Sequence, residues 1–211
     1  MPKNRVNEIL RTSLSVLLES RGFEKQSALY VRRLGDILHM IEVQRSRWND
    51  LQRQSFTLNC GVYVPGITSA FWNAPEPKQA KLTNCCVNIR VGMLKEPRHD
   101  IWWEVSNDDR MEKDAQTRAE IVSIVTESAL PFLSRFQTEL EIARFLTEER
   151  TEADKFVEPR ADVTSLVYAG LLWRRLGELN KCSMCIEEAK RRSRKTPLEA
   201  VVTAFADRCE C

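Results

Sequence analysis

The chain has 211 residues, of which 43% are hydrophobic and 29% are charged, and its formal net charge at pH 7 is +2. This length is enough for one full hydrophobic core plus a small appended unit, and the composition excludes a disordered chain. The balance of acidic and basic residues also argues against a dedicated nucleic-acid coat, which would show a strong basic excess.

The first residues, from Met1 to Arg21, are interrupted by charges and lack the apolar run of a signal peptide. No stretch approaches the length of a transmembrane helix. The chain has seven cysteines, which is an odd number, and their spacing is not that of a disulfide framework. We therefore expect reduced thiols and a cytoplasmic protein that does not enter the membrane.

The first half of the chain predicts one helix and then a series of strands. Apolar residues between Val6 and Leu18 follow a helical period, and Gly22 is expected to end this helix because glycine tolerates positive φ. Gly35-Asp36 suits a two-residue hairpin loop, and residues 67–81 are expected to be a loop. The strand-like runs are residues 28–34, 37–44, 55–64, 84–94 and 101–105.

The second half predicts helices. The period becomes helical from Asp114, Pro131 is expected to interrupt or kink that stretch, and residues 132–146 continue as helix. The predicted buried stripe consists of Ala115, Ala119, Val122 and Val125. Asp162 is a candidate N-cap for a helix that ends near Gly177. Two more helices are expected at residues 180–193 and 197–209.

This order of elements predicts an α+β fold. Consecutive strands without crossover helices favour an antiparallel sheet of about five strands, packed by helices on one face and followed by a C-terminal helical segment. The predicted division is an α+β domain at residues 1–147, a charged linker at 148–161, and a helical hairpin plus terminal helix at 162–211.

Two sequence blocks, Val43-Gln44-Arg45-Ser46 and Phe56-Thr57-Leu58-Asn59-Cys60-Gly61, occur in this order, with Ile89-Arg90-Val91-Gly92 after them. On these residues the chain, over about residues 5–145, resembles a bacterial domain-of-unknown-function family, family 4304. The resemblance implies an α+β fold and brings no established activity. Some such small bacterial domains look like immunity or accessory proteins.

The C-terminal segment is similar to a single tetratricopeptide-type hairpin. Leu176-Gly177 lies where that repeat has its Leu-Gly pair, and Cys182, Ile186 and Ala189 fall at its small-large-small positions. The alternative is an ordinary helical hairpin, because one repeat without neighbours leaves its apolar faces uncovered.

A polar binding surface is predicted on one face of the sheet and at the end of one strand. Alternation places polar side chains of three strands opposite the apolar face, and glycines at 61 and 92 leave room for an approaching backbone or ligand. The predicted surface residues are Gln44, Ser46, Arg47, Asn59, Tyr63, Asn88 and Arg90. The alternative is a solvated sheet face held by cross-strand hydrogen bonds.

Other reactive residues carry weaker signals. Cys182 and Cys185 lie one turn apart within a helix rather than in a metal-binding knuckle, so they are expected to be structural. His39 and His99 have no sequence context for a catalytic dyad. Trp48, beside Arg47, is expected to fold back on the core. We predict no catalytic residue, no metal site and no cofactor.

These observations favour a non-enzymatic protein-binding module with a protein partner, in an immunity or accessory role. One alternative is a nucleic-acid-associated factor that uses Arg45, Arg47, Trp48 and the basic cluster at residues 190–195. The other is an enzyme or small-ligand binder whose site the sequence does not reveal. The sequence does not determine the oligomeric state.

Overall fold

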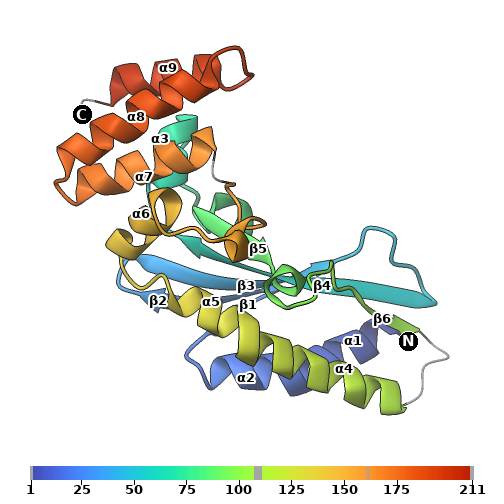
Figure 1. Ribbon diagram of the computed structural model, residues 1–211. Helices are drawn as coiled ribbons and strands as arrows, with labels where there is room; N and C mark the ends of the chain where they lie inside the picture. Colours follow the sequence, from blue (N-terminus) through green and yellow to red (C-terminus); the bar gives the residue numbers. More distant parts are fainter. Residues whose placement is uncertain (1, 107–110, 161, 210–211) are drawn as a thin grey trace. The chain divides into compact units, whose positions relative to one another are not determined.

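The computed structural model describes residues 2–106, 111–160 and 162–209 (Figure 1). It has the predicted α+β fold, with one antiparallel sheet and a C-terminal group of helices. The strands are β1 (Glu24–Gln26), β2 (Leu29–Leu34), β3 (Ile37–Arg45), β4 (Arg53–Tyr63), β5 (Val87–Arg90) and β6 (Trp103–Ser106).

Helices precede and follow this run of strands in the chain, and α3 lies between β4 and β5. The α-helices are α1 (Pro2–Leu10), α2 (Val16–Glu19), α3 (Ile67–Trp72), α4 (Met111–Ile124), α5 (Leu130–Ser134), α6 (Glu139–Thr147), α7 (Val163–Arg175), α8 (Leu179–Ser193) and α9 (Glu199–Arg208). The π-helical segments are Arg11–Ser15, which joins α1 to α2, and Val125–Ala129, which joins α4 to α5. Short 3-10 turns lie at Leu82–Asn84, Val91–Leu94 and Glu152–Asp154.

The strands follow the predicted meander as far as β5. Their order is β1-β2-β3-β4-β5, and β6 returns to pair with β4. In that pairing Arg53 lies opposite Ser106 and Phe56 opposite Trp103. The hairpin loop at Gly35 between β2 and β3 is confirmed, with φ of 59° at the glycine.

Several predicted element boundaries were wrong, two of them because side chains close local turns. The run 84–94 forms a strand only at β5, since the Asn84 side chain accepts a hydrogen bond from the backbone N–H of Lys81 and closes a 3-10 turn before it. The predicted loop at 67–81 contains α3. The predicted helix 132–146 is broken, because Thr138 caps the start of α6.

The buried stripe of α4 also differs from the prediction. The buried side chains there are Thr117, Ile121 and Ile124, whereas Ala115 and Ala119 are exposed. An isoleucine removes much more apolar area from water than an alanine does, so the helix turns its isoleucines towards the sheet. Pro131 lies within α5, directly after the π-helical segment, so the helix changes its hydrogen-bond pattern just before this residue and continues through it.

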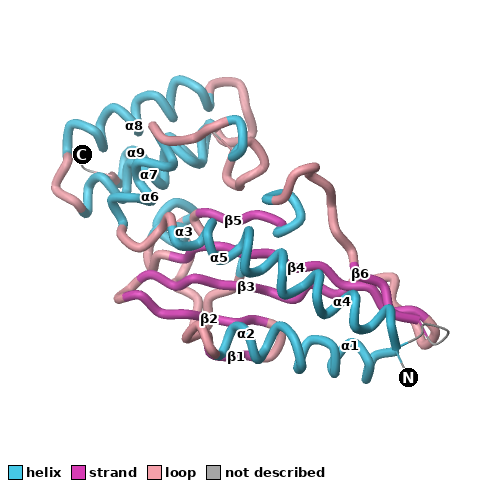
Figure 2. The backbone as a smooth tube through the Cα atoms, turned by 60° about the horizontal axis from the view of Figure 1, so that its bottom comes forward, coloured by secondary structure: helices cyan, strands magenta, loops and turns pink. Residues whose placement is uncertain are grey.

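The chain divides into two compact units. The first comprises Met1–Arg33, His39–Cys60 and Ile89–Ser134, and the second comprises Leu34–Leu38, Gly61–Asn88 and Arg135–Cys211. In the first unit, α1, α2, α4 and α5 lie along one face of the strands (Figure 2). Gly22, with φ of 78°, follows α2 and ends that helix as predicted.

The second unit is mainly helical. α7 packs against α6 and α8, and α3 contacts α7 and α9. Phe71 of α3 meets Tyr168 and Phe205 edge-on, with ring centroids 5.9 Å apart in each pair. The Asp162 carboxylate accepts hydrogen bonds from the backbone N–H groups of the first turn of α7, which confirms the predicted cap. Among the described helices, none is long and apolar enough to cross a membrane.

Candidate functional site

Three predicted surface residues on neighbouring strands meet in a polar network in the first unit. The Asn59 amide of β4 donates to Oε1 of Gln44 on β3 at 2.9 Å. Arg90 of β5 donates to the same Gln44 oxygen at 3.2 Å and to Oδ1 of Asn59 at 3.4 Å. The sequence therefore located correctly a set of side chains that lie together across three strands.

Arg90 is held in place by the segment that leads to β6. Its Nη1 atom lies 2.7 Å from both carboxylate oxygens of Asp100, and its guanidinium carbon lies 5.2 Å from the ring centroid of Trp102. The indole N–H of Trp102 donates to Asp100 at 3.0 Å. Sequence reasoning missed Asp100 and Trp102, because their contact with Arg90 requires the chain to fold back after β5.

The electrostatics of this network favour its charged form. Burial acts to raise the pKa of Asp100, but the hydrogen bonds from Arg90 and Trp102 and the positive charge nearby outweigh it and hold that pKa below its ordinary value. Asn59 is buried, with 6% of its surface exposed. Gln44 and Asp100 are exposed and Arg90 is half-buried, so the network links the strands at a face of the sheet that reaches solvent, with Asn59 as its buried member.

Gly61 and Gly92 were expected to leave room on the sheet face for an approaching backbone or ligand. In the structure, other atoms of this chain occupy that room. A Cβ at Gly92 would collide with the backbone oxygen of His99 and would lie 2.9 Å from the backbone nitrogen of Ile101. A Cβ at Gly61 would lie 2.9 Å from the Cys85 sulfur and 3.0 Å from the backbone oxygen of Val87. The predicted close approach is real at both positions, and the approaching backbone is the protein's own.

Tyr63 and Asn88, the other predicted sheet residues, belong to the second unit. The Tyr63 hydroxyl donates to the carboxylate of Glu76, which also accepts from Ser69 and from the Gly66 backbone N–H. Burial, and then the bond to Glu76, raise the pKa of Tyr63. Asn88 forms an isolated β-bridge with Glu158. These contacts hold the loop that contains Glu76, and the segment that contains Glu158, against strands within the second unit.

Ser46 and Arg47 lie at the start of the loop between β3 and β4, residues 46–52, which we call the β3–β4 loop. The Ser46 hydroxyl accepts a hydrogen bond from the Trp48 N–H at 3.1 Å. The Arg47 guanidinium lies 4.8 Å from the Trp48 ring centroid. Trp48 is 79% exposed and Leu51 is 75% exposed, so the expectation that Trp48 folds back on the core was wrong.

Short polar side chains hold this loop in one shape. The Asn49 amide donates to the Ser55 backbone oxygen at 3.0 Å and its Oδ1 accepts from the Ser55 backbone N–H at 2.7 Å. Asp50 Oδ1 accepts from the N–H groups of Gln52 and Arg53, both at 2.7 Å. The bonds from Arg53 and then Gln52 lower the pKa of Asp50. Trp48 and Leu51 form the apolar tip of this loop, and the hydrogen bonds of Asn49 and Asp50 fix the shape of the loop that carries them.

The C-terminal basic cluster is partly neutralised, because Glu187 and Glu188 pair with three of its five basic residues. Glu188 pairs with Arg191 and Arg192, each with a nitrogen–oxygen distance of 2.6 Å, and these hydrogen bonds lower the pKa of Glu188 to about 2. Lys190 pairs with Glu187 at 3.0 Å. These pairs weaken the positive field that a phosphate backbone would need.

The cysteines do not form a metal site in the part of the chain that the structure describes. No group of three or more histidine, cysteine, aspartate or glutamate residues there is placed to hold a metal ion. Cys182 is disulfide-bonded, so the expectation of reduced thiols was wrong at this position. Among the described residues, Cys60, Cys85, Cys86, Cys185 and Cys209 are not in a disulfide bond. Burial raises the pKa of Cys185 to about 11, which makes it a poor nucleophile.

Comparison with known proteins identifies the family and no activity. A family model described as Domain of unknown function (DUF4304) matches residues 14–135, more than half of the chain. This range contains the two sequence blocks that carry the resemblance, the sheet network and the β3–β4 loop. No curated protein and no solved structure matches the chain. The function therefore has to be argued from the geometry.

Proposed function

We propose that this chain, which belongs to the DUF4304 family, is a non-enzymatic protein-binding module that recognises its partner with the β3–β4 loop. The observation that carries the proposal is an exposed tryptophan and an exposed leucine at the tip of a loop with a fixed shape. Tryptophan and arginine dominate the binding energy of protein interfaces, and Arg47 stacks on Trp48 at this tip.

The fixed shape of the loop favours binding. A flexible loop loses conformational entropy when it binds, whereas a loop already held by its own hydrogen bonds loses less. Asn49 and Asp50 provide those bonds. The network of Gln44, Asn59 and Arg90 fixes the strands next to the loop, so these residues support recognition by positioning the loop.

The charge around the tip indicates the chemistry of the partner. Arg45, Arg47 and Arg53 flank the apolar tip, and the one carboxylate within the loop, Asp50, is turned towards the loop's own N–H groups. An acidic protein surface with an apolar pocket for Trp48 complements this arrangement. An immunity or accessory role, in which such a module binds one dedicated protein, fits this chemistry.

A protein partner is favoured over nucleic acid. Leu51 is about as exposed as Trp48, and a leucine side chain has no flat face on which a base can stack. Arg53 pairs with Glu104 at 3.4 Å, so the positive charge at the tip comes mainly from Arg45 and Arg47, which suits a local acidic patch better than a continuous phosphate backbone.

The test is capture of a partner from the native host with the tagged full chain, followed by calorimetry with the purified partner. Trp48→Ala removes the anchor and should weaken binding about 30-fold, the effect of losing about 2 kcal/mol at an interface hot spot. Met184→Ala is the matched control, because Met184 is 73% exposed on α8, outside the loop. It should leave the affinity unchanged.

The outcomes separate the alternatives. Equal weakening by Trp48→Ala and Met184→Ala, or none by either, would contradict recognition through the loop. Nuclease-sensitive absorbance in the captured material, with no protein in stoichiometric amount, would replace the proposal with the nucleic-acid alternative. An affinity for the partner that is insensitive to Arg47→Ala and to salt would contradict an acidic partner surface.

A further inference from the structure

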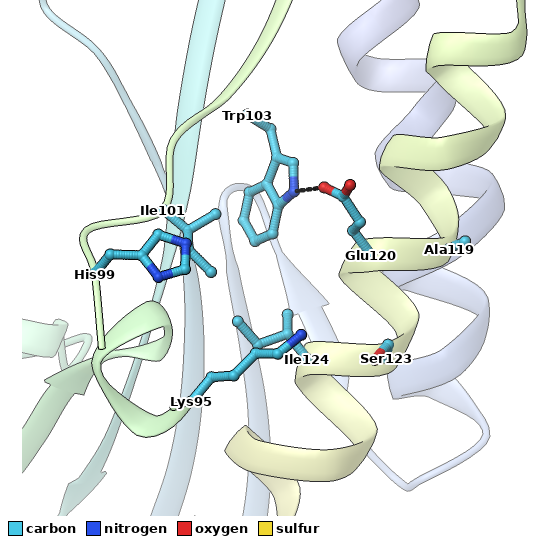
Figure 3. Close-up of a pocket in the computed structure, with 8 residues that line it drawn as sticks. All are labelled: Lys95, His99, Ile101, Trp103, Ala119, Glu120, Ser123 and Ile124. Carbon is cyan, nitrogen blue, oxygen red and sulfur yellow. Dashed lines mark hydrogen bonds between the residues drawn. The ribbon is translucent and has the colours of Figure 1, made fainter. Parts of the chain in front are cut away.

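A cavity of about 480 Å³ lies in the first unit, between α4 and the segment that leads from the turn at Val91–Leu94 into β6 (Figure 3). Small-molecule sites are cavities of this size with mostly apolar walls and a few converging polar groups. The residues that line it are Lys95, His99, Ile101, Trp103, Ala119, Glu120, Ser123 and Ile124. None of the residues proposed to contact the protein partner lies among them.

Part of the cavity wall is apolar and includes the flat face of a tryptophan. Trp103 is 5% exposed and packs its indole on Phe56, with ring centroids 5.6 Å apart, which fixes its orientation. Ile101 and Ile124 project from the two sides of the cavity next to it (Figure 3). These three side chains suit a planar apolar group, such as an aromatic ring.

Two basic side chains enter the cavity from the β6 side. Lys95 extends across it towards Ile124, and the His99 ring lies beside Ile101 (Figure 3). The Nδ1 atom of His99 lies 2.8 Å from the Pro97 backbone oxygen, and because that oxygen can only accept, Nδ1 carries a proton and Nε2 is left for another partner. Lys95 makes no ion pair within the described residues.

One acidic group faces them from α4. Glu120 accepts from the Trp103 indole N–H at 3.2 Å and from the Gln116 amide at 2.9 Å, so its two oxygens are held by different donors. Its negative charge is fixed at the wall of the cavity. The next turn of the helix, Val125–Ala129, is π-helical, and π-helical turns occur frequently at binding sites.

We propose that this cavity binds a small organic monocarboxylate with a flat apolar body. The ligand carboxylate pairs with the Lys95 ammonium, and the apolar body packs against Trp103, Ile101 and Ile124. A dianion such as a phosphate monoester binds more weakly, because Glu120 repels the second charge and the site holds one permanent cation. A neutral amide of the same shape lacks the attraction to Lys95.

The test uses three probes of one shape: phenylacetate, phenylacetamide and phenyl phosphate. Each is titrated to about 10 mM into the full chain labelled with nitrogen-15, and the indole N–H resonance of Trp103 is followed, assigned by its loss in Trp103→Phe. Phenylacetate should shift this resonance in a saturable way. Phenylacetamide should bind about tenfold more weakly, since a hydrogen bond to a charged group contributes about 1.5 kcal/mol. Phenyl phosphate should also bind more weakly, because Glu120 repels its second charge.

The matched variants are Lys95→Met and Lys78→Met. Both lysines reach solvent, and Lys78 does not line the cavity. Lys95→Met should weaken phenylacetate about tenfold, whereas Lys78→Met should leave its affinity unchanged. No saturable shift with phenylacetate, equal affinity for phenylacetamide, or equal affinity in Lys95→Met would each overturn the proposal. Tighter binding of phenyl phosphate would overturn the monocarboxylate assignment.

Discussion

The Nη1 atom of Arg90 lies 2.7 Å from both carboxylate oxygens of Asp100. This pair joins the end of β5 to the segment that folds back into β6. Through Arg90 it also reaches Gln44 and Asn59 on the two preceding strands. One arginine thus connects four separate stretches of the first unit, which explains why polar residues occupy this face of the sheet.

Replacing this arginine should destabilise the first unit. Arg90→Met keeps the length of the side chain and removes every polar contact, so we expect the free energy of unfolding to fall by about 1 kcal/mol, the value for charge-assisted hydrogen bonds reduced for partial exposure. Urea denaturation measures this change. Arg194→Met, at an exposed site on the other unit, should change nothing, and equal stability of the two variants would contradict the role given to Arg90.

Bracing of the β3–β4 loop by Asn49 gives a second prediction. Asn49→Ala removes all three hydrogen bonds between the Asn49 side chain and Ser55 without touching Trp48 or Arg47. We expect faster amide hydrogen exchange in the loop and an affinity for the protein partner reduced by roughly three- to tenfold, because the loop must then be ordered on binding.

Asn49→Asp is the informative comparison for this loop. The aspartate keeps the acceptor for the Ser55 N–H and loses the donor to the Ser55 oxygen, so its exchange rates and affinity should lie between those of the Asn49→Ala variant and the parent chain. If Asn49→Ala exchanged no faster than the parent chain, the loop would be braced by other groups and the preorganisation argument would fail.

Strand alternation was sufficient to predict the sheet network, because side chains two residues apart share a face whatever the rest of the fold does. It correctly united Gln44, Asn59 and Arg90. It could not predict Asp100 or Trp102, whose contacts depend on Gly92 and on the path of the chain after it. Strand alternation also could not predict the exposure of Trp48, because this exposure depends on the hydrogen bonds by which Asn49 and Asp50 close the β3–β4 loop.

Gly92 itself supports a third prediction. A methyl group there would collide with the backbone oxygen of His99, so Gly92→Ala must displace backbone and should lower the free energy of unfolding by about 2 kcal/mol. It should also shift the Trp103 indole resonance, because His99 and Ile101 form part of the same cavity. Chemical denaturation and nuclear magnetic resonance measure the two effects.

Gly170→Ala is the contrasting substitution. The added Cβ would lie 2.8 Å from Cδ1 of Ile186, the far end of a flexible side chain that can move, and alanine is the better helix former in α7. We expect a smaller loss of stability than for Gly92→Ala. The reverse order would contradict the close backbone approach at Gly92.

The fourth prediction concerns pH and the buried carboxylate of Asp154 in the second unit. Asp154 is 2% exposed, and its two oxygens pair with the two terminal nitrogens of Arg135 at 2.6 and 3.1 Å. Burial acts to raise the pKa of Asp154, but the hydrogen bonds from Arg135 and Thr151 outweigh it and lower that pKa below its ordinary value. The charged form is therefore the one that stabilises the fold.

A pKa that is lower in the folded state than in the unfolded state contributes stability above the unfolded value, and that stability is lost as the pH falls through the folded value. Asp154→Asn should therefore reduce the free energy of unfolding by about 2 kcal/mol at pH 7. The difference from the parent chain should shrink below about pH 4, where the carboxyl of the unfolded chain is protonated.

The measurement is a series of urea denaturation curves between neutral pH and about pH 3, with Asp207→Asn as the control. Asp207 is exposed near the end of α9, and its substitution should change stability by less than about 0.5 kcal/mol at every pH. A deficit of Asp154→Asn that stays constant down to the lowest pH would show that packing of the carboxyl group, rather than its charge, stabilises the contact with Arg135.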